Sequence, residues 1–444
     1  MLKHFLLLFL SLRAADLLNL AGGLYLVPKF VSPEELGAVL PLTSFATLIS
    51  IPLYAIAMTA LRESATLRAA SPLRAADGGG MASPSQLQAF IRGVFAAVGF
   101  ASLAALALAA ALLPRALAHF RVSDSLAGFL ALSAAFLGCV SPVYLDQLQA
   151  AKRFGAVGAV EIGAAALRLT VMAALMPFRA LAGYFAGSVA KPLVQIFAPL
   201  VLLRGTCAAV PSAAQPAPYW TRANFLRLGK TFALTLAYLA LPLLVSYREN
   251  ELIRTLLPSA DSAGYYMVTR ISDLMNYLTY PLLFVMFPYV TDHASKGESY
   301  QRLVSKSCAV IFAIAVLASL LSRHHPGFVH ADLGADAIAL LPNGGNYLAY
   351  SSHLPLLFLF MAFGAAQTII TNAEVAAGRF TFLYWFAPLN LAYLAILPRL
   401  LKTPTLGSLI SIFFAFAAIR FLAAALTDGF RGIVRWRGAS SAAA

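Results

Sequence analysis

Charged residues are scarce in this chain of 444 residues: 11% are Asp, Glu, Lys or Arg, whereas 60% are hydrophobic. A soluble domain carries about 25% charged residues, so the polar surface that keeps such a domain in water is missing. The mean hydropathy is +0.79, and apolar runs of about 20 residues, each long enough to cross a bilayer core as a helix, recur along the chain. The sequence therefore predicts an all-α polytopic membrane protein.

The chain also lacks the usual signs of a disulfide framework, a metal cluster or a catalytic site. Its three cysteines, Cys139, Cys207 and Cys308, lie far apart in the sequence. It contains no glycine-rich phosphate loop ending in Lys-Ser/Thr, no HExxH and no GxSxG motif. We therefore expect no enzymatic activity, no cofactor and no bound metal. Uphill transport by such a chain has to use an ion gradient or the gradient of the substrate itself.

The formal net charge of +14 raises the question of whether the partner is nucleic acid or anionic lipid. The Lys and Arg residues are spread along the chain and gather at alternate ends of the apolar runs, which is typical of an orientation signal in a membrane protein. The side that holds the N-terminus carries about twice as many of them as the opposite side. We therefore expect contact with membrane lipid, no nucleic-acid partner and both termini in the cytoplasm.

The apolar runs predict about twelve transmembrane helices in two six-helix lobes. The expected spans are 4–30, 37–61, 87–112, 124–145, 157–177, 181–203, 231–257, 263–288, 305–322, 353–373, 381–398 and 405–426. The N-terminal lobe is expected at 1–205 and the C-terminal lobe at 231–428, with a cytoplasmic linker at 206–230 and a cytoplasmic tail at 429–444.

An internal repeat relates the two lobes. The acidic turn SPEELG at 32–37 aligns with SADSAG at 259–264, and both turns join a long helix to a returning helix that begins near a glycine. Six helices per lobe is an even number, so both lobes have the same orientation in the membrane. We therefore expect a parallel pseudo-two-fold repeat about an axis along the membrane normal.

Polar residues interrupt two of the spans in the same pattern, R-x-x-D-L-x-N. The first copy is Arg13, Asp16 and Asn19, and the second is Arg270, Asp273 and Asn276. At 100° per residue these positions share an arc of about 120°, so each helix presents one polar stripe, and Arg and Asp at i, i+3 can pair. Such stripes either lock helices together or line a hydrated, substrate-binding cavity between the lobes, and both interpretations stay open.

Other polar residues fall near or inside spans. Arg248, Glu251 and Arg254 have the i, i+3 spacing of an ion-pair ladder at the outer mouth, although a solvated helix end has the same spacing. Glu161 and Arg168 share a helix face, and we expect a buried structural pair. Lys191 with Gln195 either reaches toward the interface or packs internally, as does Arg420.

Three stretches of the chain resemble a known family. YLVPKFVSPEELGAVLPLTSFATLISIPL and NELIRTLLPSADSAGYYMVTRISDLMNYLTYPLLFVMFP begin the two halves, and GGNYLAYSSHLPLLFLFMAF lies later in the second half. They resemble the oligosaccharide flippases of the polysaccharide transporter branch, which includes O-antigen translocases. That branch belongs to the multidrug/oligosaccharidyl-lipid/polysaccharide (MOP) exporter superfamily.

The resemblance implies a polytopic protein of a bacterial inner (plasma) membrane. It implies alternating access and translocation of a polyprenyl-diphosphate-linked oligosaccharide from the cytoplasmic to the outer leaflet for surface polysaccharide synthesis. Arg13 and Arg270 match, by location, cations of the central cavity that meet the diphosphate. The coupling ion is left open between H+ and Na+.

Two alternatives stay open beside this reading. Drug exporters of the same superfamily place a carboxylate in a cation-binding lobe, and Asp16 fits that part, so an ion-coupled exporter of small or cationic molecules is the second hypothesis. An integral membrane glycosyltransferase or polymerase is the third. That class needs a large outer loop with paired carboxylates or Arg, and the one long outer segment expected here, 323–352, holds only Asp332 and Asp336 as carboxylates.

Overall fold

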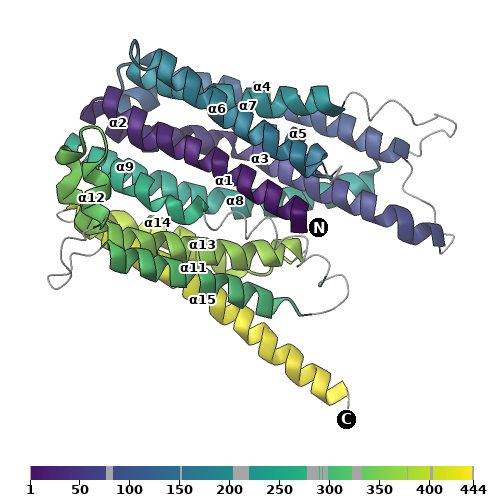
Figure 1. Ribbon diagram of the computed structural model, residues 1–444. Coiled ribbons are helices and arrows are strands. Elements are labelled where there is room, and N and C mark those ends of the chain that lie inside the picture. Colours follow the sequence, from purple (N-terminus) through teal and green to yellow (C-terminus); the bar gives the residue numbers. More distant parts are fainter. Residues whose placement is uncertain are drawn as a thin grey trace. The chain divides into compact units, whose positions relative to one another are not determined.

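The computed structural model describes residues 2–76, 84–150, 153–203, 220–277, 290, 293, 299–322, 333–377, 379–400 and 404–442. Within these ranges every regular element is helical (Figure 1). The helical elements of the described chain confirm the predicted all-α fold class.

The first half of the chain forms long helices that begin at local signals. They are α1 (Leu2–Ala21), η1 (Gly22–Leu26), α2 (Val27–Phe30), α3 (Pro33–Ala76), α4 (Pro84–His119), α5 (Ser125–Ala150), α6 (Phe154–Leu175) and α7 (Ala180–Leu203). The hydroxyl of Ser32 accepts a hydrogen bond from the Glu35 amide at 3.3 Å, just ahead of a proline that starts α3. Asp124 likewise accepts from the amides of Leu126 and Ala127 at the start of α5. Side-chain acceptors at these positions satisfy amides that have no partner inside the helix.

The second half continues with α8 (Arg222–Leu256), α9 (Ser259–Ser272), α11 (Gln301–Leu321), α12 (Leu333–Ala339), the 3₁₀ helix η2 (Gly344–His353), α13 (Leu354–Ala376), α14 (Leu383–Leu400) and α15 (Leu406–Ala442). Helix α8 begins inside the segment expected to be a linker, because Thr221 accepts a hydrogen bond from the Asn224 amide and no Pro or Gly follows until Gly229. The proline-containing part of that linker lies outside the described residues.

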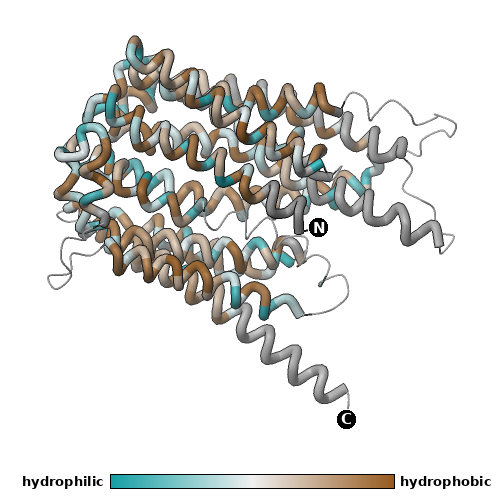
Figure 2. The backbone as a smooth tube through the Cα atoms, in the orientation of Figure 1, coloured by the Kyte–Doolittle hydropathy of each residue, from teal (hydrophilic) through white to brown (hydrophobic). Residues whose placement is uncertain are grey.

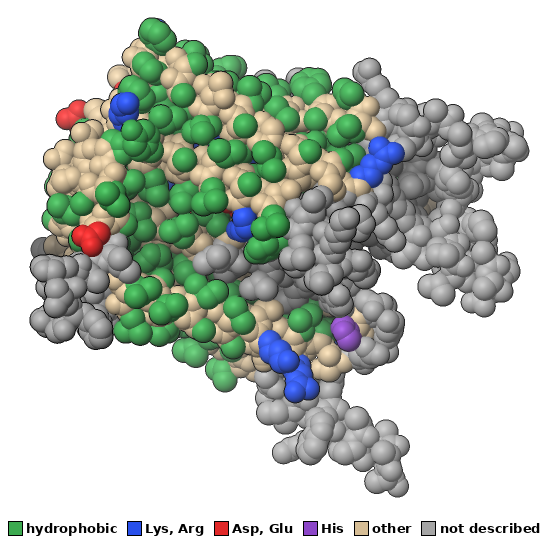
Figure 3. All heavy atoms as spheres, in the orientation of Figure 1, with side chains coloured by type: hydrophobic (Ala, Val, Ile, Leu, Met, Phe, Trp, Pro, Cys, Tyr) green, Lys and Arg blue, Asp and Glu red, His purple; other side chains and the backbone are tan. Residues whose placement is uncertain are grey.

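Ten helices in the described part of the chain are long and apolar enough to cross a membrane. The two remaining expected spans fall on α9 and α14. Brown, apolar positions dominate the lengths of the helices (Figure 2), and green hydrophobic side chains cover most of the described surface on the face shown in Figure 3. Large apolar side chains such as Phe100 on α4 and Phe197 on α7 are 78% and 61% exposed, which is the pattern of helices that face lipid.

The chain forms two compact units. Unit 1 comprises residues 1–22 and 38–247, and unit 2 comprises residues 23–37 and 248–444. Helix α8 therefore contributes residues to both, and the end of the first span belongs with unit 2. The lobe boundaries expected from the sequence stay a prediction.

Each unit has its own packed interior. In unit 1, α7 packs against α5 and α6, and α1 packs against α6. In unit 2, α13 packs against α9, α11 and α15, and the rings of Phe312, Phe363 and Phe421 meet in pairs at 5.0–5.5 Å. Ring pairs at this separation and tilt add to the stabilisation that apolar burial gives.

Glycines at the two repeated turns allow close packing. A Cβ added at Gly37 would lie 2.7 Å from the Ser262 Cβ, and one at Gly264 would meet the ring of Tyr350 at 2.5 Å. Both contacts lie within unit 2. At both of the glycines that the repeat aligns, an added side chain would therefore fit only if the neighbouring residues moved.

Candidate functional site

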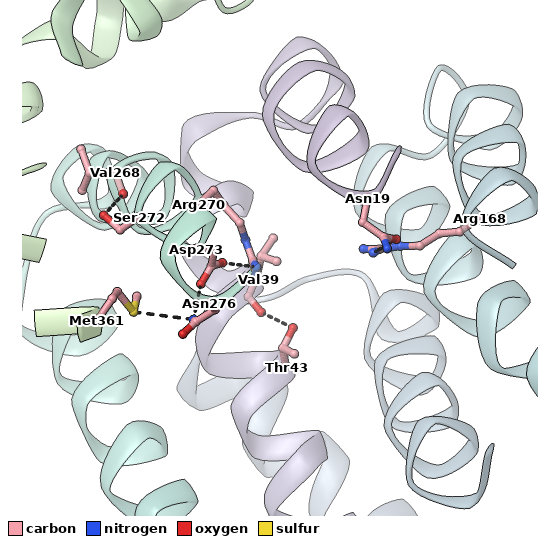
Figure 4. A network of polar contacts seen from close by, with 10 residues as sticks. All are labelled: Asn19, Val39, Thr43, Arg168, Val268, Arg270, Ser272, Asp273, Asn276 and Met361. Carbon is pink, nitrogen blue, oxygen red and sulfur yellow. Dashed lines mark hydrogen bonds and ion pairs between the residues drawn. The ribbon is translucent and has the colours of Figure 1, made fainter. Parts of the chain in front are cut away.

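The first polar stripe lies on α1, in unit 1. Arg13 Nη2 and Asp16 Oδ2 form an ion pair at 2.8 Å, as their i, i+3 spacing predicts, and the two side chains are 18% and 25% exposed. Asn19, one turn further along, accepts a hydrogen bond through Oδ1 from Nη1 of Arg168 on α6 at 2.8 Å (Figure 4). The stripe therefore faces other protein side chains, and it retains partial access at the ion pair.

The second stripe, in unit 2, is arranged differently. Arg270 Nη1 donates to Asp273 Oδ2 at 2.8 Å, and Asn276 Nδ2 donates to Asp273 Oδ1 at 3.2 Å and to the sulfur of Met361 on α13 at 3.7 Å (Figure 4). The carboxylate thus binds both other members of its own heptad.

A local irregularity of the helix at Asp273 lies between the members of this second stripe, which the sequence did not predict. Helix α9 ends at Ser272, one residue before Asp273. The hydroxyl of Ser272 donates to the Val268 carbonyl at 2.8 Å, a back-bond that often bends helices. Much of the expected span 263–288 then lies outside the described residues.

Unit 1 holds more polar residues around the first stripe. Glu161 on α6 accepts a hydrogen bond from Gln195 Nε2 on α7 at 2.8 Å, and the Gln195 Oε1 accepts from Ser141 on α5 at 3.1 Å. The prediction that Glu161 pairs with Arg168 is therefore wrong, because in the described structure each of these side chains bonds to a different neighbouring helix. Arg168 instead bonds to Asn19 and lies over the Tyr184 ring, 5.7 Å from its centroid.

The cluster at the end of α8 is buried rather than solvated. Arg248 Nη1 donates to Glu251 Oε2 at 2.5 Å, as the ladder spacing predicts. Glu251 is 8% exposed and Arg254 is 4% exposed, so the solvated helix end is excluded for these two residues. The Arg248 side chain, at 34%, is the accessible member of the cluster.

Another buried cluster in unit 2 joins residues far apart in the sequence. Glu249 accepts a hydrogen bond from the Tyr393 hydroxyl at 3.0 Å, and Arg420 donates to Asn390 Oδ1 at 3.3 Å. The Tyr393 ring stacks on Phe416 with centroids 3.6 Å apart. Sequence reasoning singled out Arg420 but missed that α14 lies between it and Glu249, since no local spacing links α8, α14 and α15.

No group of three or more His, Cys, Asp or Glu that could hold a metal occurs among the residues that the structure describes. Cys139 and Cys308 are buried free thiols. The described polar clusters consist mainly of Arg, Lys, carboxylates, amides and phenols. Such groups can hold an anionic ligand, move a proton or join helices.

Comparisons with known proteins were made by sequence and by structure. No protein-family model matches the chain, and no curated protein matches its sequence. Solved structures do match.

Two of these matches are transporters of the MATE family. The bent form of the MATE transporter VcmN from Vibrio cholerae is similar with a TM-score of 0.61 and 13% identity, covering 96% of both chains. An inward-facing multidrug resistance MATE family transporter of the MOP superfamily has a TM-score of 0.59 and 13% identity, covering 97% of this chain and 96% of the other.

A third match is a flippase. The inward closed conformation of the lipid II flippase MurJ has a TM-score of 0.62 and 12% identity, covering 96% of this chain and 87% of that chain. Identities this low establish the fold alone. The chain therefore has the multi-pass, all-helical fold of these MATE transporters and of MurJ.

Proposed function

We propose that the chain is a flippase that translocates a polyprenyl-diphosphate-linked oligosaccharide from the cytoplasmic to the outer leaflet by alternating access, for surface polysaccharide synthesis. The observation that carries the proposal is the presence of two intramembrane Arg–Asp pairs at 2.8 Å whose side chains are only partly buried. Charges inside a membrane are costly and mark substrate paths by default. The flippase among the structural neighbours supports the same class.

The chemistry of the substrate matches arginine. A diphosphate is too polar to cross a bilayer unaided, and the planar guanidinium fork binds phosphate oxygens while keeping its charge. Before the substrate binds, each Asp carboxylate neutralises the guanidinium of its paired Arg. When the substrate binds, the diphosphate replaces the carboxylate as the partner of that guanidinium. The proposed substrate-binding residues are Arg13, Asp16, Asn19, Arg270, Asp273 and Asn276.

The outer mouth of the path is proposed at the cluster of Arg248, Glu251 and Arg254. Arg248 is the accessible cation there, so it is the residue that first or last meets an anionic substrate. Glu251 and buried Arg254 hold the end of α8 in place around it. H+ or Na+ is the proposed coupling ion, and the proposed setting is a bacterial inner membrane with both termini in the cytoplasm.

An exporter of cationic small molecules is the second candidate. Two observations favour it: Asp16 is 25% exposed, and the structural neighbours include MATE transporters, one of them a multidrug resistance transporter. The two candidates differ in what they require of Asp16. A cation exporter needs this carboxylate for its substrate or coupling ion, whereas a headgroup flippase needs it only to hold Arg13.

Transport measurements in proteoliposomes distinguish the two candidate functions. We expect the wild-type protein to translocate a fluorescent polyprenyl-diphosphate oligosaccharide, and Asp16→Asn and Asp273→Asn to slow translocation only mildly, because each change frees or misplaces an arginine without removing it. Efflux of a cationic dye is measured in the same vesicles. Glu34→Gln, an exposed position outside the clusters, is the matched control. Dye efflux that disappears in Asp16→Asn, with no glycolipid translocation by the wild type, would establish the exporter instead.

A further inference from the structure

The polar cluster of unit 1 carries an excess of positive charge. It consists of Arg13 and Asp16 on α1, Glu161 and Arg168 on α6, and Lys191 on α7, which is three cations against two carboxylates. Lys191 lies one helical turn before Gln195 on the same face of α7, and Gln195 donates a hydrogen bond to Glu161 on α6. All five residues belong to the same unit, and its helices α1, α6 and α7 pack on one another in the order α1–α6–α7.

Both carboxylates of this cluster have other hydrogen-bond partners. Asp16 binds Arg13 at 2.8 Å, and Glu161 accepts from Gln195 at 2.8 Å. Among the described residues neither carboxylate forms a hydrogen bond or ion pair with Arg168 or Lys191. The nearby negative charge therefore lowers the cost of burying these two cations without occupying their donors.

The donors of Arg168 and Lys191 are only partly used. Arg168 gives one N–H to the neutral amide oxygen of Asn19, and its buried Nε has no hydrogen-bond partner in the described structure. The ammonium group of Lys191 forms no hydrogen bond or ion pair with any described residue. A buried donor without an acceptor costs about 1–3 kcal/mol, and more when the group is charged. The Arg168 Nε–H carries this cost, and an anion with several oxygen acceptors would relieve it.

We propose that Arg168 and Lys191, together with Arg13 and Asn19, form the phosphate-binding part of the site, with Arg168 supplying its free Nε–H and Lys191 its ammonium group. This inference rests on the proposed function and makes it more specific. The arginine offers directed donors and the lysine a compact charge, which suits the adjacent oxygens of a diphosphate. The two residues lie in the fifth and sixth spans, outside the R-x-x-D-L-x-N pattern.

The second stripe provides a contrast within the same chain. There the asparagine donates to the aspartate of its own heptad, whereas Asn19 accepts from a cation on another helix. The two copies of the pattern are thus unequal. The copy on α1 lies beside additional cations and holds the phosphates, whereas in the second copy the aspartate is bound by both other members of its own heptad.

Binding measurements on the full-length protein in nanodiscs test the inference. The probes are farnesyl diphosphate, inorganic pyrophosphate and farnesol, and the variants are Arg168→Gln and Lys191→Met, which remove the charge and keep a shorter unbranched side chain. Arg179→Gln removes a charge from an exposed position of the same unit and is the control. We expect each cluster variant to weaken diphosphate binding by about tenfold or more, since a charge-assisted hydrogen bond is lost. Arg179→Gln should bind as the wild type does.

Partial rescue separates a binding role from a structural one. Arg168→Lys and Lys191→Arg should recover part of the affinity, and melting temperatures should identify any variant that has simply lost its fold. Tighter binding of farnesyl diphosphate than of pyrophosphate assigns the site to a lipid headgroup, and equal affinities assign it to a soluble diphosphate. Unchanged affinity in folded Arg168→Gln and Lys191→Met overturns the inference. A wild type that binds through these residues yet translocates no lipid-linked oligosaccharide refutes the proposed flippase and leaves the phosphate site standing.

Discussion

Arg13 illustrates how a charged side chain is accommodated in a membrane helix. Insertion of an isolated arginine at the bilayer centre costs about 2.5–3.5 kcal/mol on insertion scales. Asp16 is one turn away and its carboxylate lies 2.8 Å from the guanidinium, so the heptad supplies its own counter-ion. Arg270 and Asp273 repeat the arrangement at the same distance. The pairing reduces the cost of insertion and leaves an arginine that a stronger anionic acceptor can recruit.

Replacement of Arg13 tests whether that arginine is recruited. Arg13→Ala should abolish translocation of the lipid-linked oligosaccharide while folded protein remains in the membrane, because the phosphate loses its forked donor. Arg13→Lys should retain part of the rate, since a lysine keeps the charge without the fork. The translocation rate is measured in proteoliposomes, and the amount of monodisperse purified protein shows whether each variant is folded.

The control for this pair is Arg115→Ala, which removes an exposed arginine of α4 and should leave transport unchanged. An Arg13→Ala protein that transports at the wild-type rate would assign the ion pair a purely structural role.

The sequence predicted which polar residues share a helix face, but not which neighbouring helix they meet. The i, i+3 pairs Arg13–Asp16 and Arg248–Glu251 follow from one helix alone, and the structure contains both. Arg168 and Asn19 are separated by 149 residues, and no local spacing links them. Glu161 and Arg168 share a face, yet each finds a closer partner on a different helix, which is why the expected pair was wrong.

At the scale of elements, the two repeated turns match in packing as well as in sequence. Gly37 is in the first turns of α3 and Gly264 in the first turns of α9, and both leave no room for a Cβ. The repeat found in a six-residue alignment thus marks two sites of close approach within unit 2. The alignment of the two turns predicts that these glycines are equivalent, and only the fold identifies Ser262 and Tyr350 as their neighbours.

This packing can be tested by the sign of the change in the free energy of unfolding that an alanine substitution causes. Gly→Ala inside a helix normally stabilises by about 0.5–1 kcal/mol. Gly37→Ala should instead destabilise by about 1–3 kcal/mol, because its Cβ would lie 2.7 Å from the Ser262 Cβ. Gly163→Ala on α6, where nothing lies within 4 Å of the added Cβ, is the control and should be neutral or stabilising. Thermal unfolding in detergent gives both values; equal melting temperatures for the two variants would rule out close packing at Gly37.

Element boundaries were harder to predict than element existence. Hydropathy marks only the part of a helix that is in lipid, so the expected span 37–61 became part of a helix of 44 residues, α3. The residues that follow Ala60 are mainly Ala, Leu, Arg, Glu and Ser, and the first four of these are strong helix formers. The local irregularity at Asp273 was missed for the opposite reason, since the apolar pattern continues across it.

At the scale of the whole molecule, composition was sufficient for the fold class. Helices cross a membrane only if they are apolar and about 20 residues long, and ten described helices meet that condition. Function is less constrained by the same pattern, because structures with this fold include MATE transporters and a lipid II flippase. Substrate choice depends on a few intramembrane charges, which composition cannot assign.

The bias of Lys and Arg predicts one topology for the molecule. Reporter fusions at Gly205 and at Ser440 should both give a cytoplasmic signal, because the positively charged loops stay inside. The fusions are read with paired reporters, one active only in the cytoplasm and one active only outside it. A fusion at Arg179, between α6 and α7, should give the opposite signal. An outside signal at Gly205 or Ser440 would contradict the twelve-span topology.

The length of the last helix has a practical consequence for imaging. Helix α15 has 37 residues, Leu406–Ala442, whereas its apolar span ends at Thr427. The remaining turns reach about 22 Å further at 1.5 Å per residue. A protein of 47.2 kDa that is mostly hidden in a detergent micelle offers few features for aligning particle images in electron cryomicroscopy. A helical fusion that continues α15 in register, without a flexible linker, would place a fiducial scaffold outside the micelle and make those images alignable.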